Sequence, residues 1–126
     1  MILLDTHALV WWLEDEPRLP AVVGDRIAAE GAGVSAITFY EIGQKVRLGK
    51  WPEMAPVLPG LRSRLEAGGV AILPVGGAVA ERAATMAWDH RDPFDRIIAA
   101  TALAEGLAVA TEDAALRALP GLRTVW

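Results

Sequence analysis

Short apolar runs recur along the chain and are separated by longer segments of mixed polarity. The runs cover residues 1–4, 34–36, 70–74 and 107–110, and a weaker fifth candidate covers 122–125. Runs in which polar and apolar residues do not alternate regularly are typical of strands buried on both faces of a parallel sheet. We therefore expect a buried sheet of four to five strands, with the 70–74 strand buried like the others.

The segments between these runs carry helical signals. Helices are expected over residues 7–13, 21–30, 37–48, 61–67 and 78–88, with a longer helix from Asp92 to Gly106 and a short helical turn over 114–119. Residues 51–59 are rich in proline and are expected to be irregular. Strands that alternate with helices predict an α/β fold. We expect a three-layer sandwich with a central, mainly parallel sheet, in a single domain over residues 1–126.

The segment 90–96, His-Arg-Asp-Pro-Phe-Asp-Arg, marks the start of the longest expected helix. Asp92 has the chemistry of an N-cap, and Pro93 suits the first helical position because its φ is fixed and it has no N–H to satisfy. Asp95 then lies in the first turn. It could complete a capping box with Asp92, but that role favours the longer Glu or Gln. The sequence leaves open whether Asp95 faces the helix end or a cleft.

The amino-acid composition limits the kinds of metal site and binding partner that the chain can have. The 126 residues include no cysteine, and the formal net charge is −4. Any metal must therefore be held by oxygen or histidine, and general electrostatic attraction to nucleic acid is disfavoured, although a local basic patch is compatible with this charge. No apolar run approaches the roughly 20 residues that span a bilayer. Because the chain enters a strand at once, without a basic leader, we expect a soluble cytoplasmic protein.

Four acidic residues are expected at one edge of the sheet. Asp5 follows the first strand, Glu41 lies in the helix after the second, Asp95 begins the helix before the fourth, and Asp113 follows the fourth. Right-handed crossovers gather the carboxyl ends of parallel strands, where ligands bind. Clustered carboxylates repel one another unless a hard cation such as Mg²⁺ or Mn²⁺ compensates them. Such a site fits the metal-assisted cleavage of phosphodiesters.

Each acid also has a structural explanation. Asp5 could cap the first helix, Glu41 could be an exposed partner of Lys45 at i+4, and Asp113 could cap the turn over 114–119. The hydroxyls of two neighbouring residues, Thr6 and Thr111, could be further helix caps. Four unrelated structural roles at one sheet edge are less probable than one shared site. Thr6, Thr111 and Asp92 would support the acids of such a site.

The motifs together resemble a known family. They are Asp5-Thr6-His7, the segment 35–42 with the basic run 45–50 behind it, the segment 90–96, and Thr111-Glu112-Asp113. In this order they resemble the PIN domain of VapC-type ribonuclease toxins, and the segment 90–96 is the most specific. The resemblance implies a Mg²⁺ or Mn²⁺ site for endonucleolytic RNA cleavage, formed by the acids matching Asp5, Glu41, Asp95 and Asp113, with Thr111 in support. Glu112 is an extra acid that we leave outside this set.

The resemblance also implies partners. It predicts a homodimer and a cognate antitoxin protein whose carboxyl-terminal segment covers a groove. Adjacent tryptophans Trp11 and Trp12 agree with such a groove, because neighbouring helical residues point about 100° apart and cannot face one core. Basic residues that could contact the RNA backbone are Lys45, Arg47, Lys50, Arg91 and Arg96. His90 is expected to have a structural or substrate-side role.

Two other functions remain as alternatives. A DNA-directed or general nuclease of the same fold, without an antitoxin, would need the same acids, because metal-assisted phosphodiester cleavage does not require a 2′-hydroxyl. A receiver-like signalling module would also bind Mg²⁺ at this sheet edge, but it needs a lysine near its last strand. The chain has lysines only at positions 45 and 50, which disfavours the signalling module.

Overall fold

A five-stranded parallel sheet forms the centre of the protein. The computed structural model describes residues 1–126 and places the strands in the order β3-β2-β1-β4-β5. The strands are β1 (Ile2–Leu4), β2 (Ala32–Ser35), β3 (Ala71–Leu73), β4 (Val109–Ala110) and β5 (Thr124–Val125), and every neighbouring pair is parallel. The expected parallel sheet is confirmed, and all five candidate strands are present.

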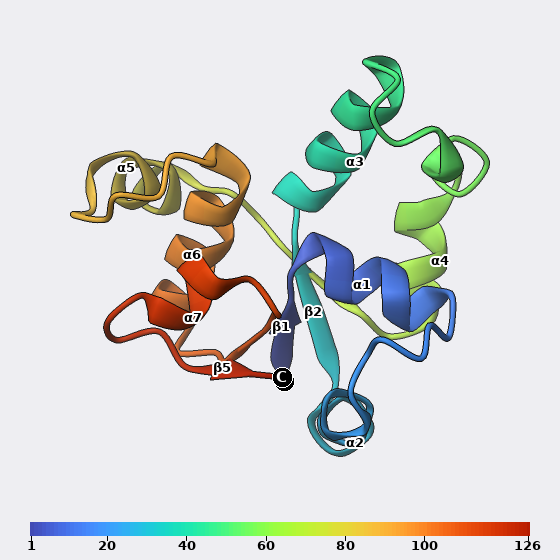
Figure 1. Ribbon diagram of the computed structural model, residues 1–126, viewed down its shortest axis with the longest axis horizontal. Coiled ribbons are helices and arrows are strands. Elements are labelled where there is room, and N and C mark those ends of the chain that lie inside the picture. Colours follow the sequence, from blue (N-terminus) through green and yellow to red (C-terminus); the bar gives the residue numbers. More distant parts are fainter.

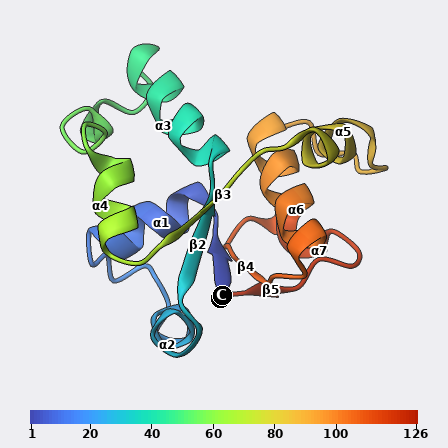
Figure 2. The same ribbon diagram turned by 180° about the vertical axis from the view of Figure 1, so that it is seen from behind.

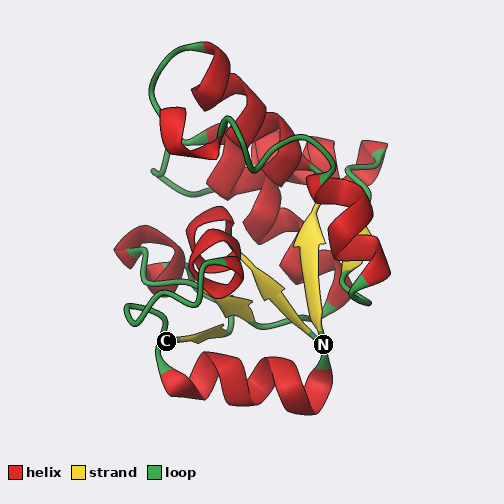
Figure 3. Cartoon of the chain, turned by 90° about the vertical axis from the view of Figure 1, so that its right-hand side faces the viewer, coloured by secondary structure: helices red, strands yellow, loops and turns green.

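Helices cover both faces of the sheet. They are α1 (Thr6–Leu13), α2 (Ala21–Glu30), α3 (Ile37–Arg47), the 3₁₀ turn η1 (Pro52–Met54), α4 (Leu61–Ala67), α5 (Gly77–Thr85), α6 (Pro93–Glu105) and α7 (Ala114–Ala118). In Figure 1 and in the reverse view of Figure 2, α1, α3 and α4 lie on one side of the sheet, and α5, α6 and α7 lie on the other. Figure 3 shows the strands between these helices. The expected three-layer α/β sandwich is confirmed.

Strand β1 contributes to both halves of the core because its side chains alternate between the two faces. Ile2 and Leu4 join the cluster formed by α1 to α4, whereas Leu3 packs with Ile98 of α6 and with Val109 of β4. All five side chains are fully buried. A central strand that is buried on both faces must be apolar throughout, which explains the unbroken run at the amino terminus.

Two expectations about local structure were wrong. The β3 strand is only half-buried because it lies at the edge of the sheet and has one neighbouring strand. The helix expected over 78–88 ends at Thr85. The α5–α6 connection that follows is held by a side chain of α6, described below, rather than by helical hydrogen bonds. No helix in the structure has the length and apolar character needed to cross a membrane.

The α6 helix begins and ends at the residues expected from the sequence. The Oδ1 atom of Asp92 accepts hydrogen bonds from the amides of Phe94 and Asp95, at 2.9 and 3.4 Å. At the other end, Gly106 has a φ of 66°, in the left-handed region that favours glycine and terminates helices. These two ends set the position of α6 across the sheet, and with it the position of Asp95.

Adjacent valines of α2 provide a test of the packing. Val23 is fully buried against the sheet, whereas its neighbour Val22 is 45% exposed. We expect Val23→Ala to lower the free energy of unfolding by about 2 kcal/mol, through lost apolar burial and the cavity left behind. Val22→Ala should change it by less than about 0.5 kcal/mol. Urea denaturation of both variants measures the difference, and equal losses would contradict the placement of α2.

Candidate functional site

The four predicted acids line one pocket at the carboxyl edge of the sheet. This acid pocket has a volume of about 120 Å³, and its lining residues are Asp5, Thr6, His7, Glu41, Lys45, Asp92, Asp95 and Asp113. None of them is hydrophobic. The loops that follow β1 and β4 supply Asp5 and Asp113, and helices α3 and α6 supply Glu41 and Asp95. Residues that are distant in the sequence therefore form one polar site, as parallel strand order predicts.

Asp5 is both a helix cap and a member of the site. Its Oδ1 atom accepts a hydrogen bond from the amide of Ala8 at 2.7 Å, so the capping role considered from the sequence is present. The residue is only 7% exposed. Burial raises the pKa of this carboxyl, while hydrogen bonds from Thr111 and Ala8 act in the opposite direction and lower it. Capping alone does not require such burial at the bottom of a polar pocket.

Glu41 pairs with Lys45, as one alternative suggested, but it is not an exposed helix residue. Its Oε2 atom lies 2.6 Å from the Lys45 ammonium nitrogen, and the residue is 4% exposed. Thr6 donates a hydrogen bond to Oε1 of Glu41 at 2.6 Å. Thr6 is therefore not the cap of α1. Its hydroxyl joins α1 to α3 and orients a carboxylate of the site.

Asp95 does not complete a capping box. Its Oδ2 atom lies 2.7 Å from Nε2 of His90, so the side chain faces the loop before α6. Burial raises the pKa of Asp95 to about 6; the hydrogen bond from His90 opposes this shift, and the negative charges of Asp92 and Asp113 add to it. Asp95 therefore faces the acid pocket rather than the end of its own helix.

Asp113 repeats the double role of Asp5. Its Oδ1 atom accepts hydrogen bonds from the amides of Ala115 and Leu116, at 2.9 and 3.0 Å, and so caps α7. The hydroxyl of Thr111 accepts a bond from the amide of Asp113 at 3.0 Å. Thr111 also bonds Asp5, so it lies between two acids of the site. The cap of α7 is Asp113 and not Thr111.

The donor atoms of the pocket suit a divalent cation. Potential ligand atoms of His90, Asp95 and Asp113 lie within 4.8 Å of one another. Asp5 and Glu41 line the acid pocket together with Asp95 and Asp113. Five carboxylates, including Asp92, face a single lysine there. Oxygen ligands and an excess of negative charge are what Mg²⁺ and Mn²⁺ require. A structural or substrate-side role is expected for His90 from the sequence, and its proximity to two acids makes it a further candidate ligand.

The predicted RNA contacts differ in their surroundings. Arg47, Lys50 and Arg91 are exposed, and Lys45 is half-buried beside Glu41. Arg96 is the exception. Its guanidinium donates four hydrogen bonds of 2.7–2.9 Å to backbone carbonyls, which are those of Ala83, Met86, Trp88 and His90. Arg96 therefore holds the α5–α6 connection with four of its five N–H groups, and its contact with RNA stays a prediction.

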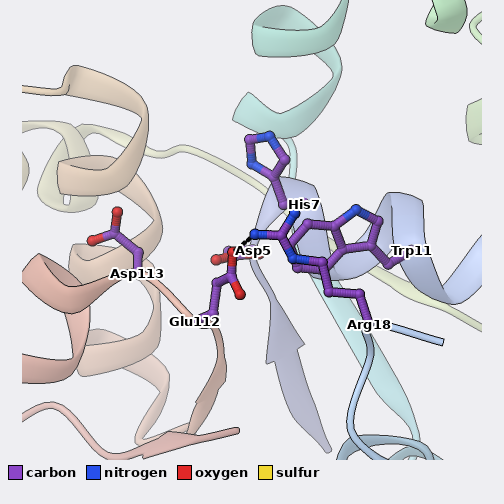
Figure 4. Close-up of a pocket in the computed structure, with 6 residues that line it drawn as sticks. All are labelled: Asp5, His7, Trp11, Arg18, Glu112 and Asp113. Atoms are coloured by element: carbon purple, nitrogen blue, oxygen red, sulfur yellow. Dashed lines mark hydrogen bonds and ion pairs between the residues drawn. The ribbon is translucent and has the colours of Figure 1, made fainter. Parts of the chain in front are cut away.

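A second pocket adjoins the first and was not foreseen from the sequence. This side pocket has a volume of about 300 Å³ and is lined by Asp5, His7, Trp11, Arg18, Glu112 and Asp113 (Figure 4). Arg18 donates to Oε1 of Glu112 at 2.6 Å. These two residues are 94 positions apart, so no local signal links them. Trp11 lines this pocket, while Trp12 packs against the core. The expectation that the two tryptophans face different surroundings is confirmed.

Comparisons with known proteins agree with this geometry. The family model of the PIN domain matches residues 2–122. Ribonuclease VapC22 of Mycobacterium tuberculosis is 33% identical over 129 residues, covering 99% of this chain and 98% of that protein. The structure of FitAB bound to an IR36 DNA fragment has a TM-score of 0.69 at 29% identity, covering 99% of this chain and 94% of that chain. A toxin–antitoxin complex from Klebsiella pneumoniae has the same fold, with a TM-score of 0.67 at 21% identity over 100% of this chain and 97% of that chain.

The raised pKa of Asp95 predicts a pH-dependent stability. The folded-state pKa is about 6 and the ordinary value is 3.8, so the folded protein binds this proton more tightly than the unfolded chain. The stability gained from that proton is complete below about pH 4 and is lost as the pH rises through about 6. Without divalent cations, Asp95→Asn should therefore be more stable than the parent at pH 7, by an amount on the order of 2 kcal/mol.

Urea denaturation in the presence of a chelator, at pH 4 and at pH 7, measures this difference. The advantage of Asp95→Asn should shrink at pH 4, where the parent carboxyl is protonated. Asp89→Asn is the matched control, because Asp89 lies in the preceding connection with an exposed side chain. An Asp95→Asn variant that is less stable than the parent at pH 7 would contradict the burial argument.

Proposed function

The chain belongs to the PIN domain family, and we propose that it is a divalent-cation-dependent endoribonuclease and the toxin of a toxin–antitoxin pair. The observation that carries this proposal is the acid pocket, where Asp5, Glu41, Asp95 and Asp113 meet at the carboxyl edge of the sheet. The similarity to ribonuclease VapC22 over almost the whole chain supports RNA as the substrate.

The four acids would hold Mg²⁺ or Mn²⁺, with His90 as a further candidate ligand. When bound, the cation would activate a water, screen the scissile phosphate and stabilise the leaving oxygen. The chain's own residues keep the ligands in place. Thr6 and Lys45 each bond one oxygen of Glu41, at 2.6 Å in both cases. Ligands held in this way lose little freedom when a cation binds, which favours binding.

Contacts to the RNA backbone would come from the rim of the pocket. Lys45 lies beside the acids, and the exposed Arg47 and Lys50 continue from it along the end of α3 and the turn beyond it. Arg91 is exposed and directly precedes Asp92, which lines the acid pocket. Basic residues near an acidic centre would contact a phosphate backbone despite the net charge of −4.

An antitoxin would fit the surface around the same site. Large apolar side chains are exposed on the helices that border the acid pocket or just beyond them, at Leu13, Tyr40 and Leu48, with exposures of 41%, 60% and 49%. A partner segment with apolar residues could cover these, and a basic residue at its end could neutralise the acids. We propose that the protein also forms a homodimer, and that it acts in the cytoplasm, where its RNA substrate would be found.

Removal of one acid tests the proposed chemistry. We expect the parent to cleave RNA only with Mg²⁺ or Mn²⁺, and Asp95→Asn to reduce that cleavage by about a hundredfold or more. The variant should remain folded, because Asn has nearly the same size and Asp92 still caps α6. Cleavage of a labelled single-stranded RNA, with and without a chelator, is the measurement.

Asp89→Asn again serves as the control and should retain full activity. Undiminished metal-dependent cleavage by Asp95→Asn would contradict the proposed site. A single-stranded DNA of the same sequence should stay intact. Its cleavage at the same rate as RNA would indicate a general nuclease instead of a ribonuclease.

Co-expression tests the toxin–antitoxin pairing. The partner is expected to be the product of a small adjacent gene, and the complex should unfold at a higher temperature than the lone chain, since a ligand of the folded state stabilises it. RNA cleavage by the purified complex should be strongly inhibited. A pair that does not co-purify, or that cleaves RNA as fast as the lone chain, would remove the toxin–antitoxin assignment.

A further inference from the structure

We infer that the side pocket binds one base of the RNA strand next to the scissile phosphate, and that it favours guanine. The inference depends on the proposed ribonuclease function and adds a subsite to it. Its residues are Trp11 as the wall, with Arg18 and Glu112 as the groups that contact the edge of the base.

The location of the side pocket makes it part of the substrate path. It shares Asp5 and Asp113 with the acid pocket, so the two pockets adjoin across these residues. Its volume of about 300 Å³ exceeds the 120 Å³ of the acid pocket. A cavity of this size is at the small end of ligand sites and suits one nucleotide rather than a longer segment. A phosphate held at the acids would place a neighbouring nucleotide here.

The wall of the side pocket is aromatic. The Trp11 ring lies 5.7 Å from that of His7 and 5.6 Å from that of Trp126, measured between ring centroids. His7 in turn stacks on Trp51, with centroids 5.1 Å apart and planes at 24°. Trp51 and Trp126 also pack against the apolar core that contacts Trp12, whereas Trp11 and His7 line the side pocket. Proteins bind unpaired bases by stacking them on such surfaces.

The polar groups are placed for the edge of a base. Figure 4 shows Arg18 joined to Glu112, and its guanidinium lies over the indole ring of Trp11, 4.5 Å from the ring centroid. Bases stack on arginine guanidinium planes as well as on aromatic rings. The side chains of Arg18 and Glu112 are 61% and 38% exposed. Such an exposed ion pair contributes little stability, so a ligand can open it at small cost. Guanine suits the pair because, on its Watson–Crick edge, O6 accepts a bond from arginine while N1–H and the amino group donate to a carboxylate.

A purely structural role for the ion pair makes a different prediction. In that case, Arg18 and Glu112 would only fasten the α1–α2 loop to the loop after β4, and their removal would change stability without changing where RNA is cut. A role in antitoxin binding would weaken capture of the partner and leave the cut sites unchanged. Base recognition alone predicts a changed base preference beside the cut.

Sequencing of cleavage ends from a randomised RNA pool, digested with Mn²⁺, tests the inference. For the parent we expect guanine to be enriched at one position adjacent to the cut. Glu112→Gln and Arg18→Ala should each reduce the guanine preference by about tenfold, since each removes a contact to the edge of the base. Trp11→Leu should lower kcat/KM by a similar factor through lost stacking.

Trp12→Phe is the matched control, because its side chain packs in the core rather than in the side pocket, and it should leave the cut sites unchanged. Thermal unfolding of each variant identifies any that fail to fold, and two independent surface variants, at Arg18 and Glu112, keep the test decisive. No cleavage by the parent would overturn the proposed function as well. If the parent cleaves RNA and all variants produce the same cleavage ends, only the proposed base subsite is overturned. If those variants also lose binding to the antitoxin, the side pocket is instead part of the antitoxin interface.

Discussion

The parallel direction of all five strands is the constraint on which the site depends. It brings the loops after β1 and β4 to one edge of the sheet, where α3 and α6 also present acids. Burial of these acids costs stability, because it raises the pKa values of Asp5 and Asp95, and the negative charges of neighbouring carboxylates add to both shifts. The apolar core on both faces of the sheet must offset this cost. A stability penalty located at the site is typical of proteins whose binding centres need a ligand to balance their charge.

Most of the fold could be predicted because its signals are local. The cap at Asp92, the glycine that ends α6 and the apolar run of β1 each act within a few residues, and the structure has them where the sequence indicated. The position of a strand in the sheet is not a local property. The sequence therefore gave no sign that β3 is an edge strand, and its apolar run appeared equivalent to that of β1.

The acids of the site could be proposed from strand order alone, whereas their partners could not. The bond between Asp95 and His90, the carbonyls around Arg96 and the pair of Arg18 with Glu112 depend on the path of connections between elements. Arg96 shows the consequence most clearly. Its four backbone partners show a structural role that its position beside an acidic motif did not indicate.

Capping and a role in the candidate site, which the sequence left as alternatives for Asp5 and Asp113, are compatible because each carboxylate has two oxygens. In both residues Oδ1 accepts the amide bonds of the following helix, so capping does not require the second oxygen. The same contact fixes the side chain at a helix end, where the positive end of the helix dipole reduces the cost of a negative charge. Capping thus prepares the site: it orients two acids before any ligand binds and lowers the cost of keeping them together.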